Sequence, residues 1–337
     1  MHKIALLSLM ALAPFALQAH NDHAPSAQQN GGHDAGAPQV APFTVVPGWA
    51  VGDNTAPTPA VGSTHGGIVV DKAGLIYVSS NRGIFVFNDA GDLVNSFQDP
   101  AYREIHAMTL REEDGVEYIY AARNRAAEAI KLKTSGEIIL SLKFPAESGV
   151  TGKFKPTAVT VKPNGNILVS DGYGTHMIFE FDPRGTYLSH FGGKAAAEDK
   201  FDTPHGITLD TRYEPARLLI ADRAKRRLVH FTLEGEFIGE VIAGLHLPCA
   251  VSIAPNGQVA VAELKGRVAL LNKDNQLTGV LGAVPDKRHG GKYKMPVAKW
   301  KTGIFTAPHG LSWDHHGNLY VQDWNMIGRV TKWTPKH

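Results

Sequence analysis

The chain has 337 residues, of which 43% are hydrophobic and 20% are charged, an ordinary balance for a globular protein with enough apolar material for a core. Its 34 Lys and Arg residues against 32 Asp and Glu residues give a net charge of +2, which excludes the strongly basic character typical of nucleic-acid-binding proteins. A single cysteine excludes an intramolecular disulfide and any cysteine-rich metal site, so the 16 histidines are the candidates for metal binding.

The first 19 residues have the pattern of a secretory signal peptide. A short basic start precedes an apolar run over residues 4–17, and Leu17-Gln18-Ala19 has the small residues of a cleavage site. The run is shorter than the ~20 residues that a membrane-spanning helix needs, and no later run approaches that length. We therefore expect an exported protein, secreted or periplasmic, without membrane insertion. Residues 20–42 are rich in Ala, Pro, Gln, Gly, Asn and His and predict a disordered leader, whose histidines either scavenge metal or are merely solvated.

From residue 43 onward the chain repeats a four-strand unit six times. Each copy begins with a segment that alternates small and apolar residues, which is typical of a half-buried strand, and in most copies a glycine-containing hairpin turn follows. The copies begin at residues 66, 106, 157, 205, 249 and 309. Repeat spacings of 40 to 60 residues and the absence of helical periodicity predict an all-β fold, a β-propeller with six blades.

The last copy has only three strands and ends near Trp333. Phe43-Thr44-Val45-Val46, upstream of the first copy, can supply the missing strand and close the ring, which removes an exposed sheet edge. We therefore expect one domain over residues 43–335. Residues 283–305 form a Lys-, Gly- and Pro-rich insertion between copies five and six, which we place at a rim, either over a site or in solvent.

The first position of each repeat (below, the start position) carries histidine in alternate copies. Its six residues are Gly66, His106, Thr157, His205, Cys249 and His309. Alternate blades of a six-fold ring lie about a third of a turn apart, so that equivalent positions bring three imidazoles to one point. Three histidines with an open fourth position are the ligand set of catalytic zinc, although imidazole also suits copper, iron or nickel. The alternative is that each histidine caps its own turn. His65 lies one residue earlier and is expected to point elsewhere.

The last position of the second strand in each repeat carries an acid in four copies, Asp171, Asp222, Glu263 and Asp323. We interpret these acids as links between adjacent blades, in which each carboxylate accepts hydrogen bonds from backbone N–H groups. The residues just after this position project towards the channel mouth and include Arg82, Arg123, Tyr173 and Arg223. Arginines there suit an anionic substrate, because guanidinium binds carboxylate in a bidentate manner. Tyr173 is either a packing aromatic or a general base whose pKa lies below its usual value of about 10.

Three motifs carry a resemblance to a known family. They are Val169-Ser170-Asp171-Gly172-Tyr173, Thr203-Pro204-His205-Gly206 and Ile220-Ala221-Asp222-Arg223. The chain resembles the peptidyl-α-hydroxyglycine α-amidating lyases, the lyase domain of peptidylglycine α-amidating enzymes, which are six-bladed propellers of NHL-type repeats. The similarity spans all six repeats and is strongest over residues 155–231.

The resemblance implies the site residues and the reaction. The positions that match the family's zinc-binding histidines are His106, His205 and His309, those that match its functional arginines are Arg82 and Arg223, and Tyr173 matches its catalytic tyrosine. The reaction cleaves a C-terminal α-hydroxyglycine, or an N-acyl-hydroxyglycine with a free carboxylate, into an amide and glyoxylate. Zn²⁺ would act as a Lewis acid on the α-hydroxyl, Tyr173 would take its proton, and the arginines would hold the carboxylate. We expect no hydroxylase domain in this chain, so that a separate hydroxylase would supply a peptide substrate.

The chain departs from the family at two places. The family binds a structural Ca²⁺, and the resemblance implies the backbone carbonyls of Ile68 and Met108 as two of its ligands. The third ligand is an aspartate directly after the last zinc histidine, and here that residue is Gly310. The disulfides of the animal enzymes are also missing, because Cys249 is the only cysteine.

Two other functions are compatible with the sequence. One is a metal-dependent propeller hydrolase such as a lactonase, although such enzymes usually hold their metal with carboxylates and amides. The other is a non-catalytic NHL-repeat propeller that binds a protein or carbohydrate partner, with the histidines serving as structural residues. Bound transition metal together with glyoxylate release would discriminate among the three.

Overall fold

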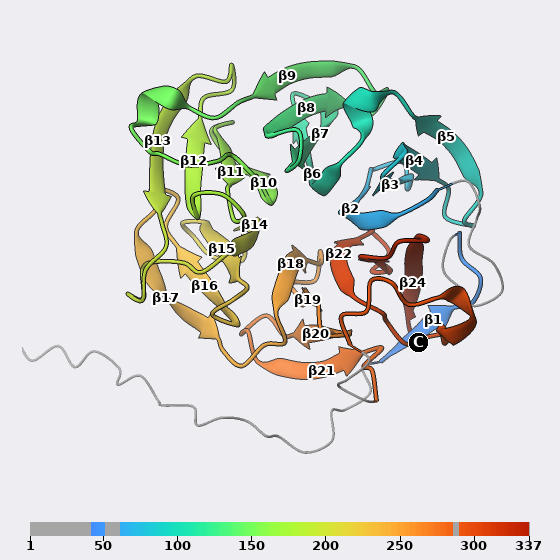
Figure 1. Ribbon diagram of the computed structural model, residues 1–337. Coiled ribbons are helices and arrows are strands. Elements are labelled where there is room, and N and C mark those ends of the chain that lie inside the picture. The colour runs from blue at the N-terminus through green and yellow to red at the C-terminus, as the bar shows by residue number, and fades with distance from the viewer. Residues whose placement is uncertain (1–41, 51–60, 286–289, 337) are drawn as a thin grey trace, which may run out of the picture. The chain divides into compact units, whose positions relative to one another are not determined.

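The computed structural model describes residues 42–50, 61–285 and 290–336, which all lie in one of two compact units of the chain, residues 35–337. The expected signal peptide and all but the last residue of the expected leader lie outside the described residues. Within the described part, the strands form six antiparallel sheets of four strands each. Figure 1 shows these sheets arranged in a ring, with one edge strand of each sheet nearest the centre. The predicted six-bladed β-propeller is confirmed.

The strands occupy four layers from the centre outward. The innermost strands are β2 (Thr64–Val70), β6 (Ile105–Glu113), β10 (Ala158–Val161), β14 (Pro204–Asp210), β18 (Pro248–Ile253) and β22 (Pro308–Trp313). The second strands are β3 (Ile76–Ser80), β7 (Val116–Arg123), β11 (Ile167–Ser170), β15 (Arg217–Asp222), β19 (Val259–Glu263) and β23 (Leu319–Asp323). The third strands are β4 (Gly83–Phe87), β8 (Glu128–Lys133), β12 (Met177–Phe181), β16 (Arg227–Phe231), β20 (Arg267–Leu271) and β24 (Arg329–Pro335). The outermost strands are β5 (Leu93–Phe97), β9 (Ile138–Leu142), β13 (Tyr187–Gly192), β17 (Phe237–Ile242), β21 (Leu277–Leu281) and β1 (Phe43–Val46).

Helical structure in the described residues is limited to short 3₁₀ turns. They are η1 (Pro100–Tyr102), η2 (Ala146–Ser148) and η4 (Val297–Lys299). Within the described ranges, no helix has both the length and the apolar character needed to cross a bilayer.

The sheet that contains β22 takes its fourth strand from the other end of the chain. β1 pairs antiparallel with β24, with Phe43 opposite Pro335 and Val46 opposite Lys332. The innermost strands contact one another in ring order, and β22 contacts β2. Pairing of β1 with β24 therefore covers the edge that the last sheet would otherwise expose.

The hydrophobic core lies between neighbouring sheets. One cluster joins Ile68 and Phe85 of the first sheet with Tyr320 and Val330 of the last, and Trp49 packs into the same cluster. Each of these side chains is less than 4% exposed. Burial between sheets stabilises the ring without a disulfide, because a buried aromatic or aliphatic side chain of this size contributes about 1.5–3 kcal/mol.

The four acids that end the second strands accept hydrogen bonds from backbone N–H groups. The donors are Lys155, Asp202, His246 and Ala307 for Asp171, Asp222, Glu263 and Asp323, respectively. Each donor lies in the segment that leads into the innermost strand of the same sheet, whereas the sequence interpretation assigned the donors to adjacent blades. These bonds fix the chain just before the start position, and so help to orient the residue found there.

Candidate metal centre and active site

β-Bulges aim the start-position residues at the centre of the ring. In four sheets the pairing between the first and second strands skips one residue, which is His106, His205, Cys249 or His309. A bulge breaks the alternation of the strand and re-aims the side chain of the extra residue. The bulge recurs at the same position of the repeat, so the side chain found there points in the same direction in each of these four blades.

The structure brings the three predicted histidines together. His106 lies on β6, His205 on β14 and His309 on β22, and each is at most 3% exposed. The ring centroids of His106 and His205 are 4.7 Å apart, and each is 4.8 Å from that of His309. This is the convergence that the alternation of histidine along the repeats predicts.

Backbone carbonyls orient two of these imidazoles. Nδ1 of His106 lies 2.7 Å from the carbonyl oxygen of Thr157, and Nδ1 of His205 lies 2.8 Å from that of Cys249. A carbonyl can only accept, so Nδ1 carries the proton in both rings and Nε2 keeps its lone pair. Metal-binding histidines are commonly held in this way.

Burial keeps these histidines neutral. Desolvation lowers the pKa of His106, His205 and His309 well below the usual value, and the positive charge of Arg223 lowers all three further. Neutral imidazole is the form that binds a transition metal, so the donor set fits Zn²⁺.

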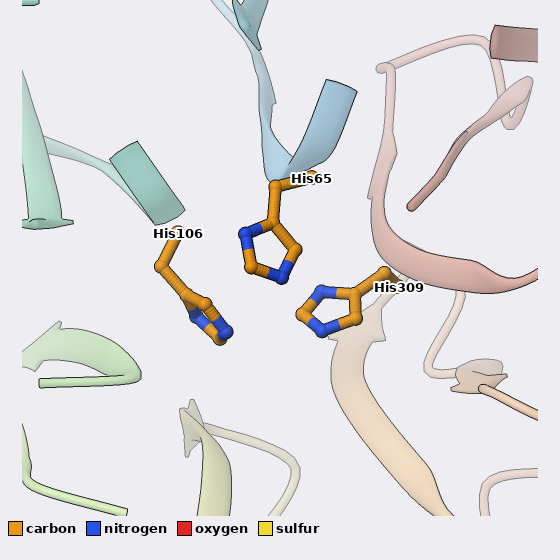
Figure 2. A group of neighbouring side chains, drawn as sticks. All are labelled: His65, His106 and His309. Atoms are coloured by element: carbon orange, nitrogen blue, oxygen red, sulfur yellow. The ribbon is translucent and has the colours of Figure 1, made fainter. Parts of the chain in front are cut away.

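Two residues that the sequence analysis did not assign to the centre, His65 and Cys249, lie next to the three histidines. The ring centroid of His65 lies 4.4 Å from that of His106 and 4.5 Å from that of His309. Figure 2 shows the three rings side by side. One ligand atom from each of these three residues lies within 4.8 Å of the others, and the same holds for His205, Cys249 and His309. Burial lowers the pKa of His65 to about 4, and Arg125 and Arg223 contribute to this shift. Burial raises the pKa of the Cys249 thiol to about 11.

The expectation that His65 points away from the centre is wrong. It assumed a regular strand, in which neighbouring side chains alternate between the two faces. Thr64 pairs with Ser80 and Ile68 pairs with Val78, so three residues of β2 lie opposite the single residue Ser79. This wider bulge turns His65 towards the other histidines. The Gly66-Gly67 pair that follows His65 was the available signal.

The hydroxyl of Tyr173 lies against the histidine cluster. It is 2.9 Å from Nε2 of His205 and 3.4 Å from Nε2 of His106. Arg223 donates to the same hydroxyl from Nη1 at 2.8 Å, and its guanidinium lies 4.9 Å from the centre of the tyrosine ring. Burial raises the pKa of Tyr173 to about 12, and Arg223 opposes this shift without reversing it. The expected lowering of this pKa is therefore not found in the protein alone.

The other predicted arginines have different surroundings. Arg82 is exposed and donates from Nη2 to the side chain of Gln98 at 3.2 Å, so its part in the site stays a prediction. Arg123 forms an ion pair with Glu128 and donates to the carbonyl of Arg103, which makes it a structural residue. The turn after β7 instead offers Arg125, which the sequence analysis missed.

A cavity of about 650 Å³ opens beside the catalytic candidates. Its lining includes Tyr173, Arg125, Lys153, Phe154 and Lys155. Pockets for small molecules typically have volumes of about 300–1,000 Å³. The cavity combines positive charge with an apolar surface next to the tyrosine hydroxyl, and so suits a substrate with a carboxylate and an acyl group.

The residues do not fit the expected calcium site. Ile68 and Met108 line a second, larger cavity of about 1030 Å³, which reaches His106. Gly310, however, lies against the backbone of Gly66, and a Cβ atom at residue 310 would be 1.9 Å from the Gly66 carbonyl oxygen. No side-chain carboxylate can start from this position, so residue 310 does not supply the acidic ligand that the resemblance implies.

No family model matches the chain. Among curated proteins, a probable peptidyl-α-hydroxyglycine α-amidating lyase of Caenorhabditis elegans is 27% identical over 264 residues, which cover 72% of this chain and 68% of the relative. Peptidyl-α-hydroxyglycine α-amidating lyase 1 of Drosophila melanogaster is 26% identical over 246 residues, which cover 66% of this chain and 43% of the relative. The resemblance to the α-amidating lyases is confirmed. This chain matches less than half of the length of the fly enzyme, and the activity of such lyases is carried over below only as a proposal.

Solved structures that resemble this chain share its fold. Virginiamycin B lyase from Staphylococcus aureus has a TM-score of 0.55 and 13% identity, with 87% of this chain and 99% of that chain covered. A gluconolactonase from Xanthomonas campestris has a TM-score of 0.60 and 13% identity, with 88% and 96% covered. At this identity the similarity to both proteins concerns the fold alone.

Proposed function

We propose that this chain is a metal-dependent carbon–nitrogen lyase that cleaves a C-terminal α-hydroxyglycine, or an N-acyl-α-hydroxyglycine, into an amide and glyoxylate. The observation that carries the proposal is the position of the Tyr173 hydroxyl, 2.9 Å from Nε2 of His205 and 2.8 Å from Nη1 of Arg223. A proton-transfer group, a carboxylate-binding group and metal-binding groups thus surround one point. The names of the nematode and fly relatives support the same substrate class.

The start-position histidines His106, His205 and His309 would hold the metal, with Zn²⁺ as the proposed ion. Zn²⁺ bound there supplies a Lewis acid that lowers the pKa of the α-hydroxyl and favours the phenolate form of Tyr173. The carbonyls of Thr157 and Cys249 keep two of the imidazoles in the tautomer that such binding requires.

Tyr173 carries out the proton transfers of the proposed reaction. Its phenolate takes the proton from the α-hydroxyl oxygen, whose electron pair forms the C=O bond of glyoxylate. The bond between the α-carbon and the amide nitrogen breaks at the same time, and Tyr173 returns the proton to that nitrogen. The reaction is redox-neutral and consumes no water, so the chain needs no further reactant.

Positive charge around Tyr173 would bind the substrate carboxylate. Arg223 is partly buried, and Arg125 lines the cavity beside the tyrosine. A guanidinium pairs with a carboxylate through two parallel hydrogen bonds, and so fixes its orientation. The acyl or peptide part of the substrate would then extend along Phe154 and the stems of Lys153 and Lys155.

We also propose that the protein acts outside the cytoplasm. The proposal depends on the signal-peptide pattern of residues 1–19. A separate hydroxylase would then supply the α-hydroxyglycine end of a peptide substrate.

The proposal is tested by glyoxylate release from α-hydroxyhippurate, with Tyr173→Phe as the decisive variant. A proton-transfer group contributes about 10²–10⁴-fold to the rate, so this variant is expected to lose activity by that factor while its zinc content stays that of the wild type. Tyr187→Phe is the matched control, because Tyr187 lies on the outermost strand β13 and its hydroxyl contacts His190 of the same strand, away from the histidine cluster. Equal activity of the two variants would refute the role of Tyr173. Full zinc loading without glyoxylate release by the wild type would refute the lyase.

A further inference from the structure

We propose that His65 is a fourth histidine ligand of the metal centre, which then consists of His65, His106, His205 and His309. The inference rests on the metal centre of the proposed function, but not on the lyase reaction. It differs from the three-histidine site that the resemblance implies.

His65 adds a fourth imidazole beside the cluster of the start-position histidines, in contact with His106 and His309. In Figure 2 the rings of His65, His106 and His309 converge from three separate strands. One ring nitrogen from each lies within 4.8 Å of the other two. Two nitrogens bound to one tetrahedral zinc at about 2.0–2.1 Å are roughly 3.4 Å apart. Binding of one ion by all four imidazoles therefore requires side-chain rotations that bring these three nitrogens closer together and turn the ring of His205, whose centroid lies 4.7 Å from that of His106 and 4.8 Å from that of His309, towards the same point.

The backbone of β2 is built to bring His65 to this point. A Cβ atom at Gly66 would lie 2.4 Å from Nδ1 of His309, and one at Gly67 would lie 2.5 Å from Oγ of Ser79. Contacts under 3.0 Å are essentially never seen for real Cβ atoms, so only glycine fits at both positions. The two glycines make room for the three-residue bulge that turns His65 inward.

An aromatic stack backs the ring of His65. The ring lies 5.4 Å from that of Trp324 at an interplanar angle of 27°, and Trp324 in turn stacks on Tyr293 at 4.1 Å and 3°. Tyr293 belongs to the insertion over residues 283–305, and its carbonyl accepts a hydrogen bond from the backbone N–H of Met326 at 2.9 Å. The insertion thus contributes to the site through the stack of Tyr293 and Trp324 on the ring of His65.

A metal would satisfy ring nitrogens that the protein leaves unbonded. Among the described residues, neither nitrogen of His65 has a hydrogen-bond partner, although the ring is packed between His106, His309 and Trp324. The residue is only partly buried, so water is the alternative partner that a bound metal ion would replace. The competing candidate, Cys249, has one, because its thiol donates to the carbonyl of Leu247 at 3.6 Å.

Four imidazoles would fill the tetrahedral set of the ion. A structural zinc site has four protein ligands, whereas a catalytic one keeps a position open. Substrate binding at this centre would therefore require a fifth coordination position or release of His65. His65 would keep the ion in place between turnovers.

The test compares zinc binding by the full chain and its variants. His65→Ala is expected to raise the zinc dissociation constant, measured by competition with a chelator, by at least about tenfold, because even the outer-shell partners of metal ligands contribute about 10–100-fold. His316→Ala, which removes an exposed histidine from the turn after β22, is the matched control and keeps the wild-type constant. Unchanged affinity of His65→Ala would overturn the proposal.

X-ray absorption at the zinc edge measures the number and type of zinc ligands in the wild-type protein, and so does not depend on whether a variant folds. The proposal expects four imidazoles around the ion, and three with one oxygen donor in His65→Gln. Three imidazoles in the wild type, a sulfur donor from Cys249, or no bound zinc would each overturn it. Three imidazoles together with glyoxylate release would leave the lyase intact, whereas four imidazoles without glyoxylate would refute the lyase and keep the four-histidine centre.

Discussion

Gly310 offers a sharp test of the reasoning about the missing calcium ligand. The resemblance to the α-amidating lyases implies aspartate at this position, but a Cβ atom here would lie 1.9 Å from the carbonyl oxygen of Gly66 and 2.5 Å from its carbonyl carbon. The φ angle of Gly310 is not in the left-handed region, so the collision alone opposes a side chain. Gly310→Ala must push β22 and β2 apart by roughly 1.5 Å to restore ordinary van der Waals contact.

The new Cβ atom would collide with backbone atoms of Gly66. No flexible side chain can therefore move away to relieve the collision. Overpacking of this kind costs about 1–3 kcal/mol, and the backbone contact places Gly310→Ala at about 3 kcal/mol. At about 2 °C per kcal/mol for a chain of this size, Tm is expected to fall by at least about 5 °C. Gly310→Asp is expected to be no more stable, with or without Ca²⁺.

Thermal unfolding followed by circular dichroism measures both variants, with Gly239→Ala as the matched control. Gly239 lies in β17, and a Cβ atom at this residue would have no neighbouring atom within 4 Å, so the control is expected to keep the wild-type Tm or raise it slightly. The reasoning is refuted if Gly310→Ala is as stable as the control. A Ca²⁺-dependent rise in the Tm of Gly310→Asp would also refute it.

Two further predictions concern charged side chains. Burial tends to raise the pKa of Asp210, but hydrogen bonds from Arg212 and His230 outweigh it and hold the pKa below its usual range. The carboxylate therefore stabilises the fold above about pH 4 and loses this effect below it, so Asp210→Asn should cost about 3 kcal/mol in urea unfolding at pH 7 and flatten the acid dependence. Arg223→Lys removes the hydrogen bond to Tyr173, worth about 1.5–3 kcal/mol, so kcat/KM should fall about 10–100-fold with zinc content unchanged.

The repeats predicted the fold because propeller blades are local structures. Each copy contains its own hairpin turns and its own alternating strands, so the sequence of one copy determines one sheet. The start position then placed His106, His205 and His309 without knowledge of any contact between blades, since the symmetry of the ring relates them. Neither the prediction of the blades nor that of the three histidines therefore required knowledge of how distant segments pack.

Departures from regular pairing were beyond the sequence analysis. The alternation rule placed His65 on the wrong side because it does not allow for three residues of β2 opposite Ser79. Spacing from the end of the second strand predicted Arg82 and Arg123 equally as site residues. The conformation of the loop, however, decides which residue of a turn reaches the site. In this structure Arg125 lines the cavity. The stack of Tyr293 on Trp324 joins two segments whose meeting depends on the path of the insertion.

The most direct test of the proposed function is the identity of the products formed from α-hydroxyhippurate by the purified, zinc-loaded protein. A carbon–nitrogen lyase breaks the bond between the α-carbon and the nitrogen, and so gives benzamide and glyoxylate in equal amounts. A hydrolase of the acyl bond gives benzoate instead. Benzamide and glyoxylate at a 1:1 ratio, lost when a chelator removes the metal, is the predicted result. Benzoate, or intact substrate with zinc fully bound, would contradict the account.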